Sequence, residues 1–360
     1  MTADKEDLVL VTGASGFIAL HVIQLLQREG YRVRGTVRSL KNEKKVQPLK
    51  ELCPDARYPL ELVEADLTND SGWDAAAKDC KYAIHIASPF PNAPPKCEDE
   101  LLIPAVEGTK RVLRACANSG TIKRVVLTSS ISAVHGESTN EAGRVYNEDD
   151  WTDITSPAVD AYSKSKTMAE RAAWEFIRSL PSEKKMELAT INPSLVMGPS
   201  ISGVVCTSLE LIKRLMDGSM PLIPRLYLAI CDVRDVAEAH LKAMIVPEAA
   251  NQRHLVNSAH LWLTDIAHIL RNEFASMGYF IPTWPVPYIG LWFYSFFDNS
   301  TRLILQRINQ TYTFSNKRMK EVLKVEGHKA KDTLQDTVHG MIDCGVVKRT
   351  WQYRRPGVPQ

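Results

Sequence analysis

Short apolar runs alternate with amphipathic stretches over the first half of the chain. Residues 8–12 and 82–87 have the length and apolar composition of buried parallel strands. Residues 15–28 instead carry apolar side chains at helical spacing and stop before Gly30, a common helix end. By the same criteria the remaining elements of this half are strands at 32–37, 60–64, 122–127 and 187–191 and helices at 101–118 and 161–179.

This alternation predicts an α/β fold with a doubly wound parallel sheet covered by helices on both faces. The pattern is less regular after residue 198, where we expect helices at 207–217, 233–245, 264–276 and 332–342 and a short strand at 254–257. We therefore divide the chain into a nucleotide-binding domain over residues 1–198, with a strand and a helix returning from about 226–260, and a mainly substrate-binding lobe over 199–360.

The composition of the chain narrows the class of protein. A net charge of +2 over 360 residues sets up no broad basic field, which argues against a dedicated nucleic-acid binder. The seven cysteines are scattered and include no Cys-x-x-Cys, so we expect reduced thiols and no metal site. The first predicted strand begins soon after the N-terminus and leaves no room for a signal peptide, so we expect a cytoplasmic protein.

An aromatic and apolar segment over residues 279–297 leaves two interpretations open. It is nearly long enough to suggest a membrane span, but three prolines and Gly290 interrupt it. We therefore expect no integral span. The segment either forms a loop and helix of the substrate lobe, where it can line the pocket, or touches a membrane surface.

A glycine-rich turn, Gly13-x-x-Gly16-x-x-Ala19, joins the first predicted strand to the first predicted helix. In such a turn the first glycine permits a sharp change of direction, and the second lets the backbone approach a pyrophosphate. The small Ala19 allows close packing of helix on strand, and the helix N-terminus offers free N–H groups to an anion. The turn therefore predicts a dinucleotide site.

Basic residues follow the second predicted strand. A ribose with a free 2′-hydroxyl is usually held there by Asp or Glu, but this chain has Arg38, followed by Lys41, Lys44 and Lys45. A guanidinium can bind a 2′-phosphate bidentately, which favours NADP(H) over NAD(H); the alternative is a solvated basic loop. After the third strand, Asp66 either accepts a hydrogen bond from the adenine amino group or caps the next turn.

A Tyr-x-x-x-Lys pair, Tyr162 and Lys166, lies on the helix predicted at 161–179. Side chains at i and i+4 share a helix face, and a nearby ammonium is expected to lower the pKa of the phenol, ordinarily ~10. Tyr162 can then donate a proton to a carbonyl oxygen while hydride reaches the carbon. Ser130, just past the fifth strand, can hold that oxygen; Ser129 and Ser132 are rivals for this role.

These residues, in this order, resemble the extended short-chain dehydrogenase/reductases of the NAD-dependent epimerase/dehydratase superfamily, most closely the branch of dihydroflavonol reductases and cinnamoyl-CoA reductases. The likeness spans about residues 8 to 245. It rests on the glycine turn, on Thr36-Val37-Arg38, His85-Ile86-Ala87-Ser88-Pro89-Phe90, Thr128-Ser129-Ser130, Tyr162–Lys166 and Asn192-Pro193-Ser194-Leu195-Val196-Met197-Gly198-Pro199. Because the residues after Ser130 differ from those typical of the plant enzymes, the plant substrates are not carried over.

The resemblance implies a Rossmann fold, bound NADP(H) and a catalytic set of Ser130, Tyr162 and Lys166. It also implies cofactor contacts from the glycine turn, the strand ends and the catalytic helix, namely Gly13, Ser15, Gly16, Phe17, Ile18, Arg38, Lys45, Asp66, Leu67, Ala87, Ser88, Tyr162, Lys166, Pro193 and Val196.

The sequence thus predicts an NADPH-dependent reductase of an aldehyde or ketone, acting on a small, apolar or aromatic carbonyl substrate. Two alternatives stay open, which are oxidation of a 3β-hydroxysteroid type of substrate and a cofactor-binding sensor without chemistry. The substrate, the reaction direction and the oligomeric state are not predicted.

Overall fold

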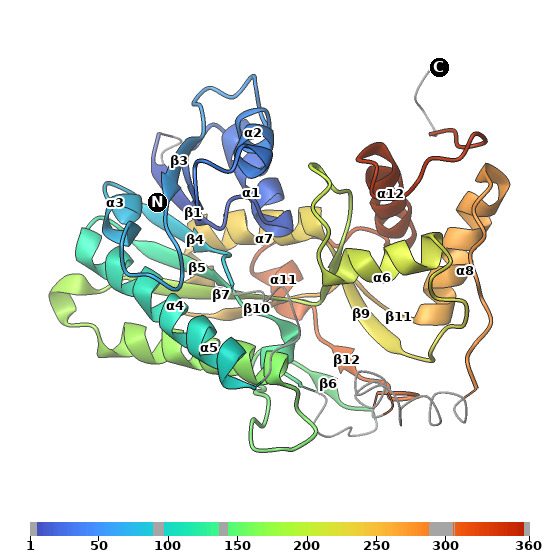
Figure 1. The fold of residues 1–360 in the computed structure, drawn as a ribbon. Coiled ribbons are helices and arrows are strands. Elements are labelled where there is room, and N and C mark those ends of the chain that lie inside the picture. The colour runs from blue at the N-terminus through green and yellow to red at the C-terminus, as the bar shows by residue number, and fades with distance from the viewer. Residues whose placement is uncertain (1–5, 89–96, 137–142, 288–304, 306, 356–360) are drawn as a thin grey trace.

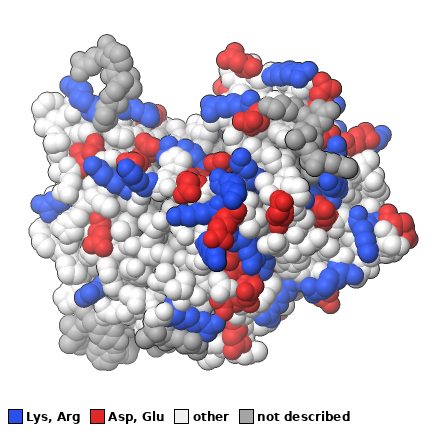
Figure 2. Space-filling view, turned by 180° about the vertical axis from the view of Figure 1, so that it is seen from behind, with Lys and Arg blue, Asp and Glu red and all other residues white. Residues whose placement is uncertain are grey.

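The structure is a computed structural model that describes residues 6–88, 97–136, 143–287, 305 and 307–355 (Figure 1). Within these residues the chain forms a large parallel sheet with its helices and a smaller group of elements beside it, which contains most of the C-terminal third (Figure 1). Charged side chains of both signs are interspersed over the face seen in Figure 2.

Seven strands of the described chain form the large sheet in the order β10-β7-β5-β4-β1-β2-β3, and every neighbouring pair is parallel. Alternate residues of β1 enter different cores: Val9 and Val11 pack on one face of the sheet, and Leu8 and Leu10 on the other. The strands are β1 (Leu8–Thr12), β2 (Arg32–Val37), β3 (Glu61–Glu64), β4 (Tyr82–His85), β5 (Arg124–Thr128), β7 (Glu187–Pro193) and β10 (Arg253–Val256).

Helices cover both faces of this sheet (Figure 1). Helices α1 (Phe17–Arg28) and α7 (Val233–Ile245) pack together on one face, while α3 (Trp73–Ala77), α4 (Asp99–Ser119) and α5 (Ala161–Ser179) share the other core. Helix α2 (Glu43–Lys50) follows β2 and buries Val46 and Leu49. The predicted doubly wound α/β fold is confirmed.

A smaller sheet has the order β11-β9-β8. The chain passes between the two sheets, because β9 joins the small sheet, whereas α7 and β10, which come next along the chain, pack with the large one. The elements here are β8 (Leu195–Met197), β9 (Tyr227–Asp232), β11 (Ala259–Trp262), α6 (Thr207–Met216), α8 (Leu263–Phe274), α11 (Lys317–Glu321) and α12 (Ala330–Asp343), together with the short parallel pair β6 (Val145–Tyr146) and β12 (Thr313–Phe314).

The buried Asp232 joins β9 and α7 to α12. Its carboxylate caps α7 by accepting from Arg234 N at 2.8 Å, pairs with the Arg234 guanidinium, and accepts from Thr333 Oγ1 at 2.7 Å. Arg234 in turn forms an ion pair with Asp336 at 2.8 Å. The three segments are thus connected by charge as well as by packing.

The helices predicted at 161–179 and 233–245 have the observed bounds. The strand predicted at 82–87 ends at His85, because the Ile86 and Ala87 N–H groups bond to Thr12 Oγ1 instead of continuing the ladder. Among the described residues no helix combines the length and apolar character that crossing a membrane requires. Most of the aromatic segment at 279–297 lies outside the described residues.

Candidate active site

The carboxyl-terminal edge of the large sheet collects the candidate residues. Gly13, Arg38, Asp66 and Ser130 follow β1, β2, β3 and β5 closely in the chain, and these strands run parallel in one sheet. In open α/β sheets ligands bind at this edge, where the strand order reverses on the two sides of β1.

The glycine turn brings its backbone close to β4. Gly13 has a φ of +69°, and a Cβ on it would lie 3.1 Å from Ala87 Cα. Gly16 donates its N–H to Gly13 O at 2.9 Å and precedes α1, whose N-terminus has no side-chain cap. Phe17 is buried and Ile18 partly buried, so they hold the first turn of α1 in the core. Both backbone shape and free N–H groups fit a pyrophosphate.

A cavity of about 160 Å³ lies beside this turn and is lined by Ser15, Val37, Arg38, Ser39, Asn42 and Lys45. Two of the lining residues are cations and none is a carboxylate. Arg38 and Lys45 reach the same cavity because α2 turns the chain back after β2. This arrangement fits a phosphate group, because the two cations attract an anion and no carboxylate repels it.

Asp66 is engaged locally in the described structure. Its Oδ1 accepts from Thr68 N and Thr68 Oγ1, each at 2.8 Å, and these bonds lower the pKa of the Asp66 carboxyl. The capping alternative is therefore present, while Oδ2 takes no part in either bond. The neighbouring Leu67 faces α4, since a Cβ on Gly108 would come within 3.0 Å of its side chain.

Tyr162, Ser130 and Lys166 meet at the sheet edge. Asp160 caps α5 by accepting from Ser163 N at 2.7 Å, which fixes the helix start at Ala161, one residue before Tyr162. The side chain of Ser130 lies close enough to the Tyr162 hydroxyl to act on its pKa. Lys166 Nζ lies 5.9 Å from the centre of the Tyr162 ring and donates to Ser88 Oγ at 3.2 Å.

The expected direction of the Tyr162 pKa is wrong for the chain alone. Burial of the hydroxyl raises the pKa of Tyr162 although 45% of the residue is exposed, and only the Ser130 hydrogen bond opposes it. Lys166 is not among the groups that lower the pKa of Tyr162, and its ammonium donates to Ser88. Burial also lowers the pKa of Lys166 to about 8, against the opposing charge of Glu170.

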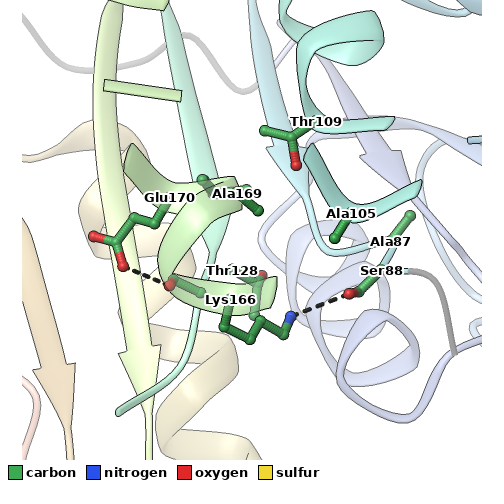
Figure 3. A pocket seen from close by; sticks show the side chains of 10 residues that line it. Ala87, Ser88, Ala105, Thr109, Thr128, Lys166, Ala169 and Glu170 are labelled. Carbon is green, nitrogen blue, oxygen red and sulfur yellow. Dashed lines mark hydrogen bonds between the residues drawn. The ribbon is translucent and has the colours of Figure 1, made fainter. Parts of the chain in front are cut away.

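Beneath Lys166 lies a second cavity, which it lines together with Ala87, Ser88, Thr109, Thr128 and Glu170 (Figure 3). Its volume of about 20 Å³ admits one water molecule and no substrate.

The rivals of Ser130 differ from it in their contacts. Ser129 donates its hydroxyl to the buried Glu170 at 2.5 Å and so points away from Tyr162. Ser132 lies within the 3₁₀ turn Ile131–Ala133 and donates its N–H to Ser130 Oγ at 3.1 Å, so Ser130 caps this turn. Pro193 and Val196, expected near the nicotinamide, are buried at the end of β7 and in β8.

His85 is a packed histidine. Thr12 Oγ1 accepts from two backbone N–H groups and lies 2.8 Å from His85 Nδ1. Its own proton is therefore donated to His85 Nδ1. Burial lowers the pKa of His85 to about 3 and keeps the ring neutral.

Sequence reasoning missed Glu170. Its carboxylate accepts from Ser129 and from Asn192, and Asn192 also donates to the Ser130 carbonyl. It stands four residues after Lys166 on α5 and so occupies the next position of the catalytic face. Its partner Arg253 is 83 residues away in β10, and no local pattern indicates this pair.

Comparison with known proteins agrees with this geometry. The model of the NAD dependent epimerase/dehydratase family matches residues 9–259. The chain is 35% identical over 348 residues to the NADPH-dependent methylglyoxal reductase of Saccharomyces cerevisiae, covering 91% of this chain and 96% of that protein. It is 36% identical over 280 residues to a cinnamoyl-CoA reductase of Medicago truncatula, covering 77% and 83%.

A solved structure of a reductase has a similar fold. The crystal structure of yeast methylglyoxal/isovaleraldehyde reductase complexed with NADPH is similar with a TM-score of 0.77 and 31% identity, over 94% of this chain and 99% of that chain.

Proposed function

The chain belongs to the NAD-dependent epimerase/dehydratase family, within the extended short-chain dehydrogenase/reductases, and from this premise we propose that it reduces a small-molecule aldehyde or ketone to the alcohol with NADPH. The yeast relative is an NADPH-dependent methylglyoxal reductase, its crystal structure is complexed with NADPH, and the Medicago truncatula relative is a cinnamoyl-CoA reductase. The observation that carries the proposal is the meeting of Tyr162, Ser130 and Lys166 at the sheet edge that also holds the cavity of Arg38 and Lys45.

The cofactor site supports NADPH over NADH. Gly13 and Gly16 leave room for the pyrophosphate and the uncapped N-terminus of α1 offers it N–H groups, while Arg38 and Lys45 meet the 2′-phosphate in the cavity after β2. NADPH, when bound, supplies the hydride that reduces the carbonyl carbon. Asp66 is proposed to keep its free oxygen for the adenine edge.

Tyr162 is proposed as the proton donor. Its raised pKa keeps the phenol protonated, so the proton is available to the substrate oxygen when that oxygen gains negative charge. Ser130, beside Tyr162, is proposed to donate its one hydroxyl proton to the same oxygen when substrate is bound. Lys166 is proposed to hold the cofactor at the same sheet edge, where its ammonium donates to Ser88 Oγ.

The substrate is proposed to be apolar or aromatic. Soon after Ser130, Ile131 and Val134 pack in one apolar cluster, whose aromatic members are Tyr146, Tyr312 and Phe314. His135 stacks on Tyr146 at 4.0 Å. We therefore propose that the substrate site is apolar on the side of Ser130.

The test is NADPH consumption by the purified protein over a panel of aliphatic 2-oxoaldehydes, branched aldehydes, aromatic aldehydes and ketones, with NADH as the comparison. We expect turnover with NADPH for at least one class, with alcohol as the product. Tight NADPH binding without reduction of any carbonyl would refute the proposal.

A further inference from the structure

A buried carboxylate lies one helical turn beyond Lys166. Glu170 is 1% exposed, and five surrounding side chains direct an N–H or O–H group at it. The donors are Ser129 Oγ at 2.5 Å, Arg253 Nε at 2.6 Å, Asn192 Nδ2 at 2.7 Å, Thr190 Oγ1 at 3.1 Å and Trp174 Nε1 at 3.3 Å. An acceptor-only carboxylate suits such a set of donors.

Asn192 connects this carboxylate to Ser130. Its Nδ2 donates both to Glu170 Oε2 at 2.7 Å and to the Ser130 carbonyl at 3.1 Å, and its Oδ1 lies 3.0 Å from Thr190 Oγ1, whose one proton faces Glu170 as well. Asn192 is completely buried, and a flipped amide would turn Oδ1 toward two acceptors, which fixes the orientation of the amide. Since Ser129 also bonds to Glu170, the main chain on both sides of the Ser130 Cα is held by one group.

Arg253 anchors Glu170 itself. The Arg253 guanidinium is nearly buried, donates to the Glu148 and Asp150 carbonyls at 2.9 and 2.6 Å, and lies 3.8 Å over the Trp151 ring. A buried ion pair of this kind contributes little net stability but a well-defined geometry. Glu170 is therefore fixed relative to β10 and β7 as well as to α5.

Glu170 and Lys166 leave α5 in different directions but line the same small cavity. Figure 3 shows Lys166 reaching Ser88, while Glu170 points toward the strands. The negative charge raises the pKa of Lys166 and so limits the fall that burial causes. The Glu170 carboxylate thus contacts the segment that contains Ser130 and also favours the charged form of Lys166.

We propose that Glu170 is a positioning residue of the active site, which orients Ser130 through Asn192 and supplies the negative charge that Lys166 experiences inside the protein. The proposal rests on the proposed reductase function and assigns Glu170 no contact with substrate or cofactor.

The first test separates orientation of Ser130 from stability. Asn192→Ala removes the link to the Ser130 carbonyl and keeps the Glu170–Arg253 pair. A misplaced hydrogen-bond donor can lower kcat by up to about 100-fold, so we expect a large fall in kcat with unchanged NADPH Kd. The matched control Trp174→Phe removes another donor to the same carboxylate that has no link to Ser130, and its kcat should equal that of the wild type.

The second test concerns Lys166. Glu170→Gln removes the charge, so the Lys166 titration and the alkaline fall of kcat/KM should both move to lower pH, while Glu170→Asp should restore them toward the wild type. The Lys166 titration is followed by NMR on protein with labelled lysine, assigned with Lys166→Arg, and needs no substrate. Gln brings its own N–H₂ toward the donors, so melting temperatures are measured on every variant.

The outcomes are distinct. An Asn192→Ala enzyme with wild-type kcat, or kcat losses that follow melting temperature equally in Asn192→Ala and Trp174→Phe, overturns the role in orienting Ser130. An unchanged Lys166 titration in folded Glu170→Gln overturns the electrostatic role. A wild-type protein that reduces no carbonyl refutes the proposed function instead, and the lysine titration still decides the role of Glu170.

Discussion

Replacing Arg38 by Ala is predicted to weaken NADPH binding without changing the affinity for NADH. Arg38 and Lys45 are the cations of the cavity after β2, and only NADPH places a phosphate there. Arg38→Ala and Lys45→Ala therefore remove an interaction that NADH never makes.

The expected size follows from exposure. Hydrogen bonds to charged groups are worth about 1.5–3 kcal/mol, and both side chains are exposed to solvent, which places each at about 1.5 kcal/mol. This equals roughly a tenfold increase in the NADPH Kd for either variant. The loss should shrink at high ionic strength because exposed charges are screened.

The assay is titration of the protein fluorescence with NADPH and with NADH at two salt concentrations. Lys44→Ala is the matched control, since Lys44 stands beside Lys45 on α2 but does not line the cavity. An equal loss of affinity for both cofactors in Arg38→Ala, or a similar loss in Lys44→Ala, would refute the assignment of this cavity to the 2′-phosphate.

Three further predictions concern other parts of the chain. The pKa of Lys166 is about 8, so if its ammonium is needed, kcat/KM for reduction should fall as the pH rises through this value, and a pH profile of Lys166→Arg should lack that fall. Gly13→Ala places a Cβ 3.1 Å from Ala87 on a residue whose backbone is left-handed, so it should lower the free energy of unfolding by roughly 1–2 kcal/mol and weaken NADPH binding. An unchanged denaturant unfolding curve and an unchanged NADPH Kd would contradict this. Asp232→Ala removes the α7 cap and the bonds to α12 and should lower the free energy of unfolding by roughly 1–3 kcal/mol, measured by urea unfolding, with a wild-type value as the contrary result.

Local signals were sufficient where one segment determines its own structure. Helix α5 begins after Asp160, whose side chain caps it, and ends before Pro181, and both features are visible in the sequence. The same holds for the glycine turn, whose position after one strand and before one helix predicts its conformation. The family resemblance extended these local signals to the choice of fold.

Short elements were missed because their stability comes from distant contacts. Helix α2 contains Pro48 and buries only two side chains, yet it brings Lys45 to the cavity of Arg38. Strands β8, β9 and β11 are three to six residues long and pair with one another across intervening helices.

The sequence could not predict the pKa shift of Tyr162 or the hydrogen-bond partner of Lys166. The spacing of Tyr162 and Lys166 predicts a shared face, but it does not show that the ammonium turns to Ser88 or that burial dominates the pKa of the phenol. These depend on β4, β5 and the Glu170 network, which meet α5 only in the folded chain.

The central claim is that Tyr162 donates the proton during carbonyl reduction, and a single-turnover experiment tests it most directly. NADPH is bound first to the wild type and to Tyr162→Phe, with the Kd measured for each, and a carbonyl substrate accepted by the wild type is then added. The account predicts equal NADPH affinity and a loss of at least about 100-fold in the rate of hydride transfer in the variant. Hydride transfer at the wild-type rate in Tyr162→Phe would contradict it.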